Sequence, residues 1–129
     1  MAFEPDENNF KQLSDVVKSS NLKNIELFKA AVGAWSGKVS FSQNGNMGSH
    51  IVDKDKTSSL VDVFSLSDFI KEKPSFIKMD IEGAELDALK GAEELIKLLK
   101  PNLAICLYHK PFDLFEIPTY LNKLVPEYK

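Results

Sequence analysis

The chain has 129 residues, enough for one domain, and its 43% hydrophobic and 27% charged residues are ordinary values for a globular protein. The net charge of −3 and the absence of arginine provide no basic surface for nucleic acid or an anionic membrane. No apolar stretch approaches the roughly 20 residues of a membrane span, and the single Cys106 cannot form an internal disulfide, which favours a reduced, cytoplasmic protein.

Strand and helix patterns alternate in the first half of the chain. Residues 2–5 predict the end of a strand, and Asp6 is a suitable N-cap for a helix whose apolar residues fall on one face. Residues 24–32 predict a second strand, and the alternation in residues 36–43 predicts a half-exposed one. The polar stretch that follows, which contains two glycines and ends at His50, predicts a mobile loop.

The second half continues the alternation. A strand at residues 59–65 is followed by a short helix that stops before Pro74. The later predictions are a buried strand ending at Asp80, a helix broken near Gly91, a strand over residues 102–109 covered on both faces, and short tail helices interrupted at Pro118 and Pro126. This order of elements predicts an α/β fold with a mostly parallel sheet.

Three of the predicted strands end on an ionisable residue: Glu4, Asp80 and His109. In an open parallel sheet, ligands bind beyond the carboxyl ends of the strands. We therefore expect two carboxylates and an imidazole to gather on the side of the sheet where a substrate would bind.

Each of these residues also has a purely structural interpretation. An acid at a strand end can simply cap the next helix, and this alternative stays open for Glu4. Asp80 lies three residues ahead of the predicted helix, a position that suits a cap poorly and favours a functional role. Glu82 and Glu85 lie near the first helical turn, where negative charge contributes about 0.3–1 kcal/mol, and this explanation is preferred for Glu85. His109 could be an ordinary loop histidine.

Several segments resemble, in the same order, the FkbM-type S-adenosylmethionine-dependent methyltransferases. The most specific is "FIKMDIEGAELDALKGAEELI", and the others are "AFEP", "NIELFKAAVG", "SLSDFI" and "KPNLAICLYHKP". The resemblance covers almost the whole chain. It implies a Rossmann-like methyltransferase sheet, a cofactor of S-adenosylmethionine, and a hydroxyl acceptor on a sugar, glycan, lipid or other small molecule.

The resemblance also implies roles for individual residues. Glu4 would accept hydrogen bonds from the ribose hydroxyls of the cofactor, because a carboxylate offers two oxygens to a vicinal diol. Ala31 and Val32 would lie near the adenine. Asp80 would face the transferable methyl group, with Asp80 or His109 as the base and Glu82 orienting it. Asp80 and Glu82 could instead hold a divalent ion, although two carboxylates are a thin ligand set.

The amino end departs from the family pattern. Such methyltransferases begin with a strand and a Gly-rich loop, whereas three residues precede Glu4 here and none of the six glycines forms that motif. We therefore expect residues 1–129 to be a single partial domain, incomplete at the amino end, inactive alone and able to self-associate through an exposed sheet edge. Two alternatives stay open: a non-catalytic α/β interaction module, and a nucleotide-binding domain without transferase activity.

Overall fold

The computed structural model describes residues 1–42 and 58–128, so the loop predicted around His50 lies outside the described residues. The chain divides into two compact units. The first comprises Met1–Ala31 and Gly37–Val63, and the second comprises Val32–Ser36 and Phe64–Lys129. No helix of the described part is long and apolar enough to cross a membrane.

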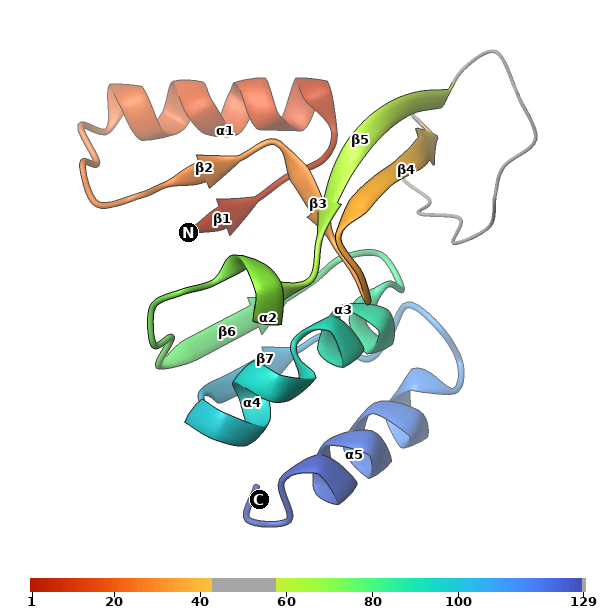
Figure 1. The fold of residues 1–129 in the computed structure, drawn as a ribbon. Coiled ribbons are helices and arrows are strands. Elements are labelled where there is room, and N and C mark those ends of the chain that lie inside the picture. Colours follow the sequence, from red (N-terminus) through yellow and green to blue (C-terminus); the bar gives the residue numbers. More distant parts are fainter. Residues whose placement is uncertain (43–57, 129) are drawn as a thin grey trace. The chain divides into compact units, whose positions relative to one another are not determined.

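The first unit opens with a strand, a helix and a second strand (Figure 1): β1 (Ala2–Phe3), α1 (Glu7–Ser19) and β2 (Leu27–Phe28). The two strands are parallel neighbours, with Ala2 opposite Leu27. Asp6 caps α1 as predicted, since its Oδ1 accepts the N–H groups of Asn8 and Asn9, each at 2.9 Å. Such a cap contributes about 1 kcal/mol, so the helix start is fixed locally.

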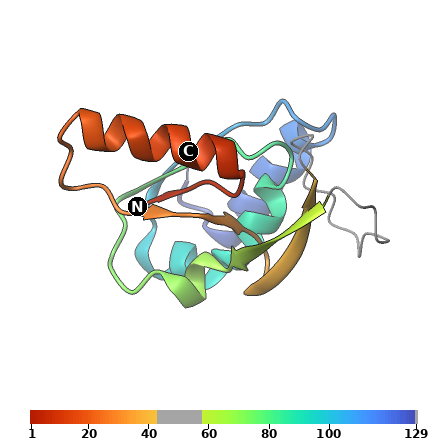
Figure 2. The same ribbon diagram turned by 90° about the horizontal axis from the view of Figure 1, so that it is seen from above.

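A three-stranded sheet follows, in the order β3-β5-β4. Its strands are β3 (Ala30–Val32), β4 (Gly37–Ser42) and β5 (Ser58–Phe64), and β4 runs antiparallel to β5, as Figure 2 shows from above. Ala31, Val61 and Val63 are buried together, with Val39 packed against them. The strand predicted over residues 24–32 is thus two short strands, β2 and β3, which belong to different sheets.

The second unit has two parallel strands, with helices before, between and after them. Its elements are α2 (Leu66–Phe69), β6 (Phe76–Met79), α3 (Glu85–Gly91), α4 (Glu93–Leu99), β7 (Asn102–Ile105) and α5 (Asp113–Leu124). Phe76 lies opposite Asn102 and Met79 opposite Ile105 in the β6–β7 pair. The described fold is therefore mixed α/β with small sheets, two of which are parallel pairs, and not one continuous sheet.

The helix predicted to break near Gly91 does break there. A Cβ added to Gly91 would lie 1.9 Å from the Gly33 carbonyl oxygen, so only glycine allows this approach of α3 to the chain that follows β3. The Gly91 carbonyl also accepts a hydrogen bond from the buried Ser65 hydroxyl at 2.8 Å. Contacts of α2 with α4 and of α3 with α5 complete the packing of the helices.

Some predicted details are wrong. β6, expected to be buried, has Ile77 and Met79 buried but Phe76 exposed. β7, expected to be covered on both faces, is half-buried in a two-stranded sheet. The tail is one helix that continues through Pro118. Proline already has a helical φ, and the carbonyl it leaves without a helical donor belongs to the exposed Leu114, where water can reach it.

Candidate functional site

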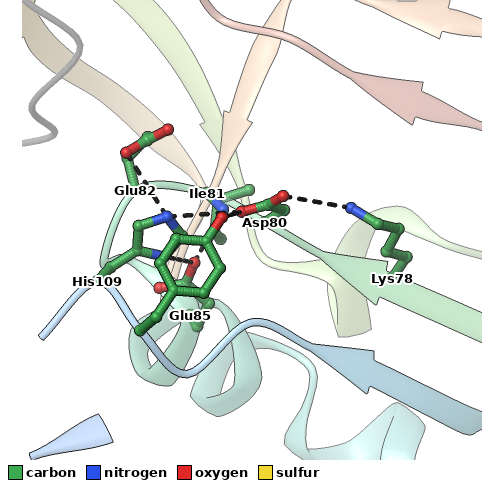
Figure 3. Close-up of polar contacts among 7 residues, drawn as sticks. Lys78, Asp80, Ile81, Glu82, Glu85 and His109 are labelled. Atoms are coloured by element: carbon green, nitrogen blue, oxygen red, sulfur yellow. Dashed lines mark hydrogen bonds and ion pairs between the residues drawn. The ribbon is translucent and has the colours of Figure 1, made fainter.

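The carboxyl ends of β6 and β7 meet at one edge because the two strands are parallel. Asp80 directly follows β6, and the Cys106 N–H donates to the Met79 carbonyl at 2.9 Å, extending the pairing by one residue past β7. His109 follows shortly afterwards, and its Nε2 lies 3.5 Å from Asp80 Oδ1 (Figure 3). The structure therefore brings together two of the three strand-end residues predicted from the sequence.

A tight turn carries Glu82 to the same imidazole. The Ala84 N–H donates to the Ile81 carbonyl at 3.2 Å, and Glu82 and Gly83 both have left-handed backbones, with φ of 56° and 91°. For Glu82 this conformation costs about 1–2 kcal/mol relative to a right-handed one. Its Oε2 lies 3.6 Å from His109 Nε2, the nitrogen that Asp80 also contacts (Figure 3), so two carboxylates meet at one nitrogen.

Glu85, assigned from the sequence to helix-dipole stabilisation, lies inside the site. It is fully buried, its Oε1 accepts the Ile81 N–H at 2.8 Å, and the same oxygen is 2.8 Å from His109 Nδ1. The pattern that could have revealed it is the apolar stripe of the helical pair. Glu85, Leu89, Ala92 and Ile96 fall on one face, and all four are fully buried.

Two polar atoms here lack hydrogen bonds among the described residues: Glu85 Oε2 and His109 Nδ1. Nδ1 lies 2.8 Å from Glu85 Oε1, an ion-pair contact that lacks the geometry of a hydrogen bond. A buried polar atom left without a partner costs about 1–3 kcal/mol. Such a cost is typical of a site that holds something beyond its own side chains.

Tyr108 is a second residue that the sequence did not reveal. Its Oη donates to Asp80 Oδ1 at 2.8 Å, and its ring lies 4.2 Å, centroid to centroid, from the His109 ring. Neighbours on a strand point to opposite faces, but the chain has left β7 at Ile105. Both side chains can therefore turn toward Asp80, and no sequence periodicity predicts this.

The charges around Asp80 keep it ionised. The hydrogen bond from Tyr108, followed by Cys106 and Lys78, lowers the pKa of Asp80, and Lys78 Nζ lies 3.6 Å from Oδ2. The same hydrogen bond raises the pKa of Tyr108 to about 12. Desolvation, then Asp80, raises the pKa of Cys106. Asp80 is therefore an acceptor near neutral pH, and Cys106, which is partly exposed, stays a thiol.

The residues expected at the cofactor lie elsewhere in the chain. Glu4 follows β1 in the first unit and is half-buried, and its Oε1 accepts the Asp6 N–H at 2.8 Å. Ala31 and Val32 are buried in β3. Ala31 belongs to the first unit, whereas Val32 belongs to the second, as do Asp80, Glu82 and His109.

Comparison with known proteins identifies the class of protein. The model of the Methyltransferase FkbM domain matches residues 1–128, so the chain belongs to the FkbM methyltransferase domain family. The chain is also similar to the crystal structure of Methyltransferase FkbM from Methylobacillus flagellatus KT, with 34% identity and a TM-score of 0.78. That match covers 98% of this chain and 30% of the other. A search of curated proteins gave no match.

Proposed function

We propose that the chain acts in S-adenosylmethionine-dependent transfer of a methyl group to the hydroxyl oxygen of a sugar, glycan, lipid or other small molecule. The observation that carries this proposal is the convergence of Asp80, Glu82 and His109 beyond β6 and β7 in a member of a methyltransferase family. Exposed carboxylates beside an imidazole suit an acceptor that must lose a proton.

The residues of the chain fit the ribose side of such a cofactor. Glu4 uses Oε1 to accept the Asp6 N–H, which fixes the carboxylate and leaves Oε2 for a ribose hydroxyl. Ala31 and Val32, both buried in β3, would lie near the adenine. When bound, the cofactor supplies an electrophilic methyl group on a sulfonium.

The acidic cluster would prepare the acceptor. Its hydroxyl oxygen gives a proton to Asp80 or to His109 Nε2 as it forms the new bond to the methyl carbon. The exposed carboxylate of Asp80, held by Tyr108 and Lys78, is the group best placed to accept a hydrogen bond from the acceptor. Glu82 then orients the imidazole through its contact with the same nitrogen, Nε2.

A methyl-transfer assay with labelled cofactor and a panel of hydroxyl acceptors tests this proposal. In a complete enzyme that contains this domain, Asp80→Ala should lower turnover by about 10²-fold or more, with a smaller change in cofactor affinity. Glu4→Ala should weaken cofactor binding first. The matched control is Asp87→Ala, which removes an acid of α3 that pairs with Lys90 on the surface.

Wild-type turnover in the Asp80→Ala protein would contradict a role for this carboxylate in the reaction. Binding of adenosine as tightly as the complete cofactor, with no transfer to any acceptor, would indicate a nucleotide-binding domain instead. The self-association expected from the sequence stays a prediction and can be followed by sedimentation of the same samples.

A further inference from the structure

The site contains buried polar atoms that the proposed methyl transfer does not use. Glu85 is fully buried with Oε2 unpartnered, and the side chain of His109 is only 9% exposed with Nδ1 unpartnered among the described residues. Neither atom is placed to touch an acceptor directly. Polar groups that are buried at a cost to folding, in contact with each other and with an exposed acid, are typical of metal ligands.

Asp80, Glu85 and His109 each offer one ligand atom, and these three atoms lie within 4.8 Å of one another. Metal–nitrogen and metal–oxygen bonds of about 2.0–2.2 Å place neighbouring ligand atoms about 3.0–3.4 Å apart and opposite ones about 4.2 Å apart. Asp80 contacts Nε2 of His109 and Glu85 contacts Nδ1, so a shared ion on one ring nitrogen requires the partly exposed Asp80 side chain to rotate toward Glu85.

The contact between His109 Nδ1 and Glu85 Oε1 also supports a metal site. The two atoms are 2.8 Å apart, yet they are not aligned for a hydrogen bond. Neighbouring ligands of one ion also stand close together without a hydrogen bond between them, so this contact is compatible with a shared ion. We propose that Asp80, Glu85 and His109 bind one divalent transition-metal ion.

The donor set selects the kind of ion. One imidazole with two carboxylates suits zinc, manganese or ferrous iron, whereas magnesium and calcium prefer oxygen ligands alone. The surrounding charge is favourable as well, because Glu82 adds a third carboxylate near the imidazole while Lys78 is the only cation paired with Asp80 among the described residues.

The catalytic use of the ion rests on the proposed function. A hydroxyl bound to a divalent cation loses its proton more readily, so the ion would assist the step assigned above to Asp80 or His109. Metal binding itself requires neither the cofactor nor the acceptor. It can therefore be tested on the chain alone, and its outcome is independent of any methyl-transfer assay.

The experiment is titration calorimetry of the chelator-treated chain with zinc chloride, manganese chloride and, for comparison, magnesium chloride. We expect one site per chain for zinc and for manganese, each at least about 10-fold tighter than magnesium. Asp80→Asn and His109→Gln should each weaken zinc binding by about 100-fold or more. Asp87→Asn, which neutralises a neighbouring acid of α3, should leave it unchanged.

Glu85→Gln is the most direct variant, since its amide oxygen can still accept the Ile81 N–H. Because Glu85 is buried, the folding of this variant must also be checked by circular dichroism. If the Glu85→Gln protein does not fold, the Asp80→Asn variant, at an exposed position, still decides the test. Broadening of the His109 ring resonances by manganese would support the site. No zinc uptake, or unchanged uptake in both Asp80→Asn and His109→Gln, would overturn it whatever the methyl-transfer assay gives.

Discussion

At the scale of single residues, one side-chain pair links α4 to α5. The Tyr120 hydroxyl donates to Glu93 Oε2 at 3.0 Å, and Lys97 pairs with the same carboxylate one turn further along α4. Lys97 first, and then Tyr120, lower the pKa of Glu93. Desolvation, followed by Glu93, raises the pKa of Tyr120 to about 12. The tyrosine is therefore a neutral donor to an ionised acceptor across the physiological range.

We expect Tyr120→Phe to lower the melting temperature at neutral pH, and this loss to shrink in acid. The folded pKa of Glu93 lies below its ordinary value of 4.5, so its contribution is present above pH 4.5 and disappears as the pH falls through the lowered value. Thermal unfolding of wild type and variant from pH 7 to pH 3 measures the difference.

The control is Tyr128→Phe, which removes a hydroxyl that donates to the Pro101 carbonyl at 2.6 Å. A carbonyl does not titrate in this range, so the fall in melting temperature caused by Tyr128→Phe should stay nearly constant with pH. An equally constant difference for Tyr120→Phe would show that Glu93 is not the partner that matters.

At the scale of elements, the junction between α3 and α4 depends on two backbones in contact. The Gly91 carbonyl is held by Ser65, and the Gly91 α-carbon faces the Gly33 carbonyl. Leu89 and Ile96, on either side of the break, are both fully buried. The missing side chain of Gly91 thus lets both short helices keep one buried face against the chain that follows β3.

Gly91→Ala should destabilise the protein by about 1–3 kcal/mol or more, because its Cβ would lie 1.9 Å from a backbone oxygen that cannot rotate aside. Urea unfolding followed by circular dichroism measures this. Lys90→Ala, next to it and exposed, removes only a surface ion pair with Asp87 and should change stability by less than about 1 kcal/mol. Equal stability of the two variants would show that the junction tolerates a side chain.

At the scale of the whole molecule, the sequence predicted the order of elements better than their packing. Asp80 and His109 were predictable because parallel strands end at one edge, a rule that needs only the strand order. The role of Glu85 in the site was not predicted. Its position near a helix start suggested stabilisation of the helix dipole, although the residue also belongs to the buried stripe of the helix. The single partial domain stays a prediction beside the observed division into two units.

For residues 1–129 taken alone, we expect no binding of S-adenosylmethionine tighter than about millimolar. The contact that the sequence assigns to the ribose is Glu4, and a hydrogen bond to a charged group contributes about 1.5–3 kcal/mol, whereas micromolar affinity requires about 8 kcal/mol. The 129 residues contain no Gly-rich loop for the methionine end. Titration calorimetry measures this affinity, and a low-micromolar constant would reveal a cofactor site built by other residues of the chain.

The left-handed backbone at Glu82 has a consequence for how this position tolerates change. Glycine there would relieve the backbone, and asparagine would be accepted more easily than most residues, whereas valine or isoleucine would be resisted. Only an acid retains the negative charge near His109 Nε2. In a library of all replacements, a screen for folded protein and a screen for function would therefore rank the same variants differently, with glycine favoured by the first and glutamate by the second.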